Sequence, residues 1–370
     1  MLQTSHKNGR SLAANLQGIY TNVIEYLIFS LYTYYVYKYK GGVFMEILLS
    51  CLLLIAGFVA LIKGADWFVD GSSGVAANFK VPSVIIGLTI VAMGTSAPEL
   101  AVSTSAAIAG SNEIALSNVV GSNIFNLLAV LGICALIHPI PIDKTITKRD
   151  FPISIVISVI TLIAVGIGFV LSGNIAGTGM PDNVGEMSRP FGIALLVMFV
   201  AYIIMLIIQA KKDRVREEES TAPKPVWKCI ILILIGLACI IAGGEFVVDS
   251  AKKIAAAAGM SETLIGLTIV AVGTSLPELV TSIVASKKGE NGLAVGNVVG
   301  SNIFNILLIL GVSSTINPIA VNLASLLDLA ILIVVSVITF IFAKSGKLGR
   351  PAGVIMVGLY VADVVFAILR

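Results

Sequence analysis

The chain has 370 residues, of which 57% are hydrophobic and only 12% are charged, and its formal net charge is +3. Soluble domains carry about 25% charged residues, so this composition, with a mean hydropathy of +1.00, excludes an ordinary soluble domain. Long apolar runs recur along the whole length, and a membrane-spanning helix needs roughly 20 such residues. The composition therefore predicts an all-α polytopic membrane protein in a lipid bilayer. We expect no nucleic-acid partner, no obligate protein partner and no cofactor.

Residues 1–44 precede the first clear span and form the expected N-terminal extension. Within them, Ile19–Tyr37 is apolar and aromatic but contains Glu25 and is followed by two lysines. No small-residue cleavage site follows this run, as one would in a signal peptide. The segment is thus either an extra spanning helix, an interfacial helix or part of a dispensable extension. We favour the extension, because Met45 opens a core that is complete without the preceding residues.

Ten apolar segments follow and form the expected core. They fall into two sets of five, which define a first repeat at 45–210 and a second at 226–370. Between them, KKDRVREEESTAPKP at 211–225 is charged and ends in prolines, so we expect a solvated linker. The segments are 46–69, 82–109, 113–137, 151–171 and 190–210 in the first repeat, and 226–248, 261–287, 291–316, 322–343 and 351–369 in the second.

A 40-residue segment that occurs twice is the most informative feature of the chain. Residues 87–126 and 266–305 align without a gap at an offset of 179, and 26 of the 40 positions are identical. Five helices per repeat is an odd number, so the second copy has to enter the membrane from the opposite side. The pattern predicts two inverted five-helix repeats, related by a pseudo-twofold axis in the membrane plane.

The distribution of Lys and Arg predicts the orientation. With the linker in the cytoplasm, the loops on that side and their flanks hold 15 of these residues, and the opposite loops hold three. Positive residues are enriched in cytoplasmic loops. We therefore expect a multi-pass protein of the cell inner (plasma) membrane with a cytoplasmic linker.

Each copy of the repeat places a carboxylate in an otherwise apolar stretch, Glu99 in GTSAPE and Glu278 in GTSLPE. A charge at membrane depth is costly, so such a residue is by default a functional-site hypothesis. The proline before each glutamate lacks an N–H and clashes with the carbonyl four residues back. We therefore expect the helix to kink or unwind at 94–98 and 273–277. Backbone oxygens loosened there have to be buried in protein, wetted or used by an ion.

Hydroxyl and amide side chains accompany both glutamates. Thr and Ser lie four and three positions before each one, which places them on the same helix face. A second motif, GSNIFN, adds a Ser and an Asn four positions apart. The candidate ligands are Thr95, Ser96, Glu99, Ser122 and Asn126 in the first repeat, and Thr274, Ser275, Glu278, Ser301 and Asn305 in the second. Such hard oxygen ligands suit Ca²⁺ and Na⁺ better than zinc or copper, and Mg²⁺ dehydrates reluctantly.

Other polar residues of the repeats have a structural interpretation. Hydroxyl and amide side chains in membrane helices commonly join neighbouring helices, and charged groups near helix ends are usually solvated. We expect the first role for Ser103, Ser282, Asn118 and Asn297, and the second for Asp66, Asp70, Glu245 and Asp249.

GTSAPE and GTSLPE, each followed by GSNIFN, resemble the α-repeat signatures of the sodium/calcium exchangers of the cation/calcium antiporter superfamily. The prokaryotic single-domain members are the most similar, and the resemblance covers 45–370. It implies ten helices in inverted repeats, a secondary antiporter rather than an enzyme, and one Ca²⁺ site among several Na⁺ sites. Glu99 and Glu278 would then be shared ligands, and the carbonyls of Ala92 and Ala271 would contribute to the flanking Na⁺ sites.

The resemblance also implies that the first and sixth core helices, near 46–69 and 226–248, slide as a gate. Asn305 departs from some family members, which carry Asp there. The potassium-dependent branch uses that Asp, so Asn305 favours potassium independence and leaves the stoichiometry open. The proton/calcium branch typically has different motifs around its glutamates.

The favoured hypothesis is therefore a Na⁺/Ca²⁺ antiporter that works by alternating access. The alternatives are a proton-driven antiporter of Ca²⁺ or another cation and, from another class, a cation channel or a membrane scaffold. A channel would show flux without a counter-ion gradient, and a scaffold would not need two complete sets of ligands.

A chain that starts at Met45 should insert into the membrane and exchange ions normally, because both five-helix repeats are complete without residues 1–44. The measurement is ion exchange by the truncated and the full chain at matched membrane levels. Loss of insertion or activity on truncation would show that Ile19–Tyr37 is a working part of the protein.

Overall fold

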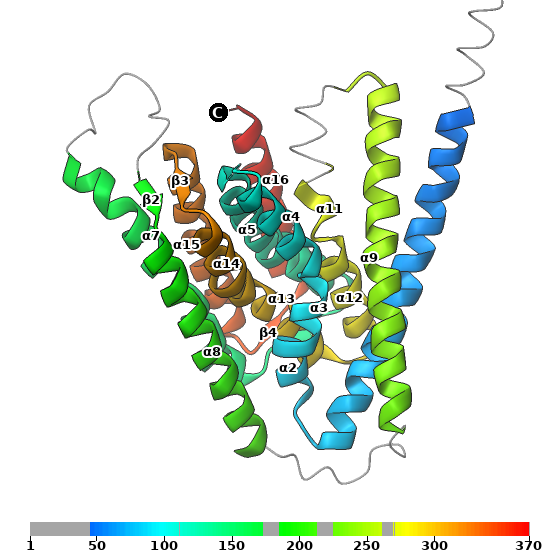
Figure 1. The fold of residues 1–370 in the computed structure, drawn as a ribbon. Helices are drawn as coiled ribbons and strands as arrows, with labels where there is room; N and C mark the ends of the chain where they lie inside the picture. Colours follow the sequence, from blue (N-terminus) through cyan, green and yellow to red (C-terminus); the bar gives the residue numbers. More distant parts are fainter. Residues whose placement is uncertain are drawn as a thin grey trace, which may run out of the picture. The chain divides into compact units, whose positions relative to one another are not determined.

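A computed structural model describes most of the chain and shows an almost entirely helical protein (Figure 1). The residues that it describes are 45–110, 112–172, 185–212, 225–260, 269 and 271–369. The expected N-terminal segment and nearly all of the expected linker lie outside these residues. The chain divides into two compact units, residues 1–53 and 54–370, and all contacts given below lie within the second unit.

The described residues contain eight helices long and apolar enough to cross a membrane, or nine if a bent pair counts as one span. These spans are Met45–Phe79, the bent pair Ser83–Thr95 and Ala97–Ile108, Ile114–Ile137, Ile146–Gly166, Arg189–Lys212, Val226–Ala257, Asn291–Ile316, Leu323–Ala343 and Arg350–Leu369. The chain is thus a polytopic all-α membrane protein. The expected segment 261–287 is described only in part, so the count of ten stays a prediction.

Several spans are built from consecutive α- and π-helical elements. The helical elements of the first half, after the first helix, are α2 (Ser83–Ile86), η1 (Gly87–Val91), α3 (Ala92–Thr95), α4 (Ala97–Ile108), α5 (Asn112–Phe125), η2 (Asn126–Val130), α6 (Leu131–Ile137), η3 (Ile146–Asp150), α7 (Phe151–Ser172) and α8 (Arg189–Lys212). The helical elements described in the second half are α9 (Val226–Ala257), α11 (Ala271–Gly273), α12 (Leu276–Lys287), α13 (Asn291–Phe304), η6 (Asn305–Leu310), α14 (Gly311–Ile316), α15 (Leu323–Ala343) and α16 (Arg350–Leu369).

Two helices are longer than the hydropathy predicted. The first continues to Phe79 rather than ending near residue 69, and α9 continues to Ala257 rather than ending near residue 248. The added turns of α9, at 249–257, contain three charged residues, which lower the hydropathy, but they are also rich in alanine. Alanine and lysine are good helix formers, so the helix continues where the apolar run stops.

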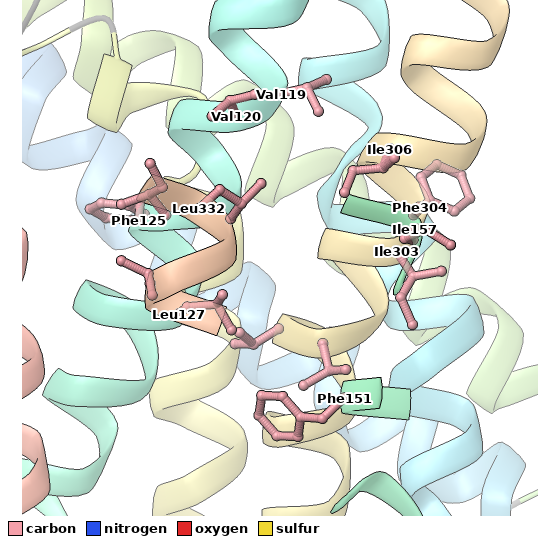
Figure 2. Packing of buried hydrophobic residues seen from close by; sticks show 14 of the residues in the cluster. Val119, Val120, Phe125, Leu127, Phe151, Ile157, Ile303, Phe304, Ile306 and Leu332 are labelled. Atoms are coloured by element: carbon pink, nitrogen blue, oxygen red, sulfur yellow. The ribbon is translucent and has the colours of Figure 1, made fainter. Parts of the chain in front are cut away.

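The spans that contain the GSNIFN motifs are the most deeply buried. In an apolar 18-residue stretch of Asn291–Ile316, 94% is buried inside the protein, and in that of Ile114–Ile137, 78% is buried. The corresponding share in the other single spans is 11–39%. Phe125 and Phe304, at equivalent places in the two motifs, lie in the packed interior shown in Figure 2. Each makes an edge-on ring contact at 5.3 Å between centroids, Phe125 with Tyr360 and Phe304 with Phe199. The motifs are therefore at the centre of the protein rather than on its lipid-facing surface.

Short strands connect segments from the two halves. β1 (Ile140–Pro141) pairs antiparallel with β4 (Lys347–Leu348), and β2 (Gly185–Met187) pairs antiparallel with β3 (Ile319–Val321). β1 and β3 start 179 residues apart, so they are equivalent positions. Each half thus contributes one strand to each pair, which ties the halves together at two places.

Glycines bring the first helix and α9 into backbone contact. A Cβ added at Gly57 would lie 2.9 Å from the carbonyl oxygen of Gly243, and one added at Gly64 would lie 2.8 Å from that of Gly236. Residue numbers rise along one helix as they fall along the other, so the two helices run antiparallel. Glycine permits such close approach between membrane helices.

Replacing Gly64 with alanine should lower the thermal stability of the protein, because the new methyl group would collide with a backbone oxygen that cannot rotate away. Overpacking of this kind costs about 1–3 kcal/mol. The measurement is the melting temperature of the detergent-solubilised protein. Gly358→Ala is the matched control, since a Cβ at that helical position meets no described residue within 4 Å. Equal melting temperatures for the two variants would contradict the tight crossing.

Candidate functional site

A break in the helix precedes each buried glutamate. Ser83–Thr95 and Ala97–Ile108 meet at 48°, and Ser96 between them has the non-helical angles φ −83° and ψ 9°. Ser275 has nearly the same conformation, with φ −93° and ψ 7°, before α12. The predicted kink is therefore confirmed for the first repeat, and the second has the corresponding break. Both glutamates lie in the first turn of the helix that follows, where the helix dipole favours negative charge.

Each break supplies a hydroxyl to the glutamate of the other repeat. Glu99 and Glu278 are both buried. Ser275 Oγ donates to Glu99 Oε1 at 3.1 Å, and Ser96 Oγ donates to Glu278 Oε1 at 2.9 Å. The second oxygen of each carboxylate, Oε2, is buried without a hydrogen-bond partner. The two carboxylates thus belong to one site that both repeats build.

This arrangement corrects one expectation from the spacing. Ser96 was expected to lie beside Glu99, and Ser275 beside Glu278, but each hydroxyl bonds the glutamate of the other repeat instead. The rule that residues three or four apart share a face holds only along a continuous helix. Because the helix is interrupted at Ser96, the side chain is free to turn toward the opposite repeat.

The serines of the two GSNIFN motifs join the same site. Ser275 Oγ lies 3.0 Å from Ser122 Oγ as well as bonding Glu99, and Ser301 Oγ donates to Glu278 Oε1 at 3.4 Å. Ser122 and Ser301 are both buried. The structure therefore brings four of the predicted hydroxyls and both predicted carboxylates together.

The predicted threonines face amides across the repeats. Thr95 Oγ1 donates to Asn297 Oδ1 at 2.9 Å, and Thr274 Oγ1 donates more weakly to Asn118 Oδ1 at 3.5 Å. Each of these asparagines also donates to the backbone carbonyl of its own repeat's glutamate, at 3.4 Å in both cases. They bond the serines at 103 and 282 at 3.0 Å as well. These contacts agree with the structural role expected for Asn118 and Asn297.

The remaining predicted positions surround this centre. Asn126 and Asn305 are buried, and the Oδ1 atom of each has no hydrogen-bond partner. Ala92 is buried, and its carbonyl accepts the backbone N–H of Ser96 at 3.0 Å. Ala271 begins α11. The predicted carbonyl ligands are thus placed beside the helix breaks, and their use by an ion stays a prediction.

Two residues near the centre were missed by the sequence reasoning. Asn123 and Asn302 bond one another's backbone across the repeats, and each accepts a hydrogen bond from the amide at 305 or 126. The available signal was their presence in both copies of GSNIFN. Spacing alone did not single them out, because they lie one position after the predicted serines and off their helix face.

An ion pair outside the centre joins the first helix to the end of α12. Lys288 Nζ lies 2.7 Å from Asp66 Oδ1 and 2.5 Å from Asp70 Oδ1. Partial burial lowers the pKa of Lys288, but the hydrogen bonds to the two aspartates outweigh this effect and raise the pKa above its usual value. The two aspartate side chains are 40% and 39% exposed, as expected for solvated groups, and they also tether the helix that carries them.

The donor set indicates which ions the centre can hold. Within the described residues, no three or more His, Cys, Asp or Glu side chains gather at one point. The centre offers two carboxylates with neutral hydroxyl and amide oxygens. Such hard ligands are typical of Ca²⁺ and Na⁺ sites.

The sequence matches the family described as sodium/calcium exchanger protein over residues 49–208 and 228–369. These ranges contain nearly all of both repeats. The chain belongs to the sodium/calcium exchanger family. It is therefore a membrane transporter of the class that exchanges Ca²⁺ for another cation.

Relatives of similar length support this placement. The sodium/calcium exchanger MaX1 of Methanosarcina acetivorans is 33% identical over 351 residues, covering 86% of this chain and 98% of the relative. The inner membrane protein YrbG of Escherichia coli is 35% identical over 326 residues, covering 85% and 95%. Among solved structures, the sodium-calcium exchanger NCX_Mj superposes with a TM-score of 0.72 at 33% identity, covering 86% of this chain and 99% of that one.

Proposed function

We propose that this protein exchanges Na⁺ for Ca²⁺ across the membrane, with both ions bound in turn at the centre between the repeats. The observation that carries the proposal is the pair of buried carboxylates, each hydrogen-bonded by a serine of the other repeat. The proposed ligands are the ten side chains and two carbonyls predicted from the sequence. Sodium coupling is further supported by MaX1 and NCX_Mj, which are themselves sodium/calcium exchangers.

The charge of the centre explains why the two ions would exclude one another. Glu99 and Glu278, when ionised, supply a charge of −2, which one Ca²⁺ or two Na⁺ neutralise. Both loads together would leave excess positive charge in a poorly polarisable site, at a cost of several kcal/mol or more. The empty site would keep −2 buried and would resist the step that changes its access. Only loaded forms would then cross readily, and this condition couples the two ion flows.

We further propose ten membrane helices in two inverted five-helix repeats. The antiparallel crossing of the first helix and α9 supports the inversion, because these helices hold equivalent positions in the two repeats. Their lipid-facing character and close mutual contact make them the proposed gate, which would slide past the fixed centre. The proposed location is the inner (plasma) membrane, with the linker in the cytoplasm.

Proton-driven exchange of Ca²⁺ is the alternative, because buried carboxylates can also carry protons. The two functions differ in the gradient that drives Ca²⁺ uptake. The test reconstitutes the protein in proteoliposomes and imposes a Na⁺, K⁺ or proton gradient in turn. Uptake should follow the Na⁺ gradient. Uptake that follows only the proton gradient would overturn the sodium assignment and leave antiport itself intact.

Glu99→Gln and Glu278→Gln should each abolish Na⁺-dependent Ca²⁺ uptake, because either change halves the charge that holds the divalent ion. Glutamine has nearly the same shape and can still accept the serine hydroxyl, so the protein should fold. Uptake is measured at matched membrane levels, with Glu290→Gln, outside the centre, as the control. Substantial uptake by both single variants would rule out the proposed site.

A further inference from the structure

Four asparagines of the two GSNIFN motifs form a closed set of hydrogen bonds between the repeats. Asn123 Nδ2 donates to the backbone carbonyl of Asn302 at 3.1 Å, and Asn302 Nδ2 donates to that of Asn123 at 3.1 Å. Asn305 Nδ2 donates to Asn123 Oδ1 at 3.0 Å, and Asn126 Nδ2 donates to Asn302 Oδ1 at 3.1 Å. All four residues are buried.

The backbone carbonyls dictate which way every amide in this set points. A carbonyl can only accept, so the group that Asn123 presents to Asn302 has to be its NH₂. The oxygen of Asn123 is then the atom that faces Asn305, so Asn305 has to donate a hydrogen bond to it from its own NH₂. The oxygen of Asn305 is thereby turned away from Asn123, and it is the buried atom that has no partner. The other half of the set is fixed in the same way. The backbone carbonyl of Asn123 accepts from the NH₂ of Asn302, whose oxygen then accepts from the NH₂ of Asn126 and leaves the oxygen of Asn126 without a partner.

A change of helix type occurs at this point. The α-helix α13 passes into the π-helix η6 at Asn305, and α5 passes into η2 at Asn126. π-Helical turns are frequent at functional sites, and here each one begins at a predicted ligand amide, Asn126 or Asn305.

We propose that Asn123 and Asn302 are positioning residues that fix Asn305 and Asn126, respectively, with their oxygens toward the transported cation. This inference rests on the proposed function and goes beyond it, since neither residue is among the proposed ligands. A freely rotating amide would present its NH₂ to a cation for part of the time, and that donor repels the ion. Fixing the amide beforehand removes this cost from binding. Each positioning residue acts on the amide of the other repeat.

The crossed connection gives a specific test. Asn123→Ala removes the acceptor that holds Asn305, and Asn302→Ala removes the one that holds Asn126. Alanine keeps its backbone carbonyl, so Asn302→Ala leaves Asn123 correctly oriented. The two substitutions are therefore matched in chemistry and location but act on different site amides.

The measurement is the Ca²⁺ concentration for half-maximal exchange, determined separately from the maximal rate, for single and double variants. Asn123→Ala alone should raise this concentration roughly fivefold, as expected for the loss of one hydrogen bond. In an Asn305→Ala background it should change the value by less than about twofold, because the amide that it positions is gone. Asn302→Ala in the same background should retain its full effect. The reverse pattern should hold in an Asn126→Ala background.

Equal effects of both substitutions in both backgrounds would show that the asparagines only pack the repeats together, and would overturn the inference. Asn→Ser variants at 123 and 302 repeat the test if an alanine variant does not reach the membrane. Calcium-induced thermal stabilisation of the detergent-solubilised protein reports binding without transport and should follow the same crossed pattern. Failure of the proposed function is distinguishable, because the unaltered protein would then show no Na⁺-dependent Ca²⁺ exchange at all.

Discussion

Two buried carboxylates that no neighbouring cation neutralises are the constraint on which this structure depends. Within the described part of the chain, neither Glu99 nor Glu278 forms an ion pair with a Lys or Arg. Burying a charge is costly unless it is paired or hydrogen-bonded. The protein meets part of this cost with helix N-termini and with serine hydroxyls from the opposite repeat. The Oε2 atom of each carboxylate has no hydrogen-bond partner and, on the proposed function, is available to a transported cation.

The contacts of one repeat recur in the other with the partners exchanged. Ser96 with Glu278 corresponds to Ser275 with Glu99, and the ring pairs of Phe125 and Phe304 correspond in the same way. The tether formed by Lys288 with Asp66 and Asp70 departs from this symmetry. The residue of the first repeat that is equivalent to Lys288 is Ala109, which carries no charge. The first helix is therefore held by charge at a place where the equivalent contact for α9 is not available.

Much of the fold followed from the sequence because its causes are local. Apolar length predicted the spans, and the proline before each glutamate predicted the break, since both effects depend on neighbouring residues alone. The partners across the site could not be predicted this way. Whether Ser96 bonds Glu99 or Glu278 depends on how two breaks 179 residues apart pack together. The role of Asn123 was hidden for the same reason, because it depends on a carbonyl in the other repeat.

The crossed hydrogen bonds also limit how the protein can change its access to either side of the membrane. Moving the two repeats apart would break both serine–glutamate bonds and the asparagine set together, leaving several buried polar groups unpaired, each at about 1–3 kcal/mol. The first helix and α9 contribute none of these bonds. They approach one another at glycines, around which apolar side chains such as Phe68, Ile240 and Val247 pack without polar bonds to the centre. On the proposed function, the inexpensive motion is therefore a displacement of this helix pair past an intact centre, with the Lys288 tether as the polar contact that has to break or shift.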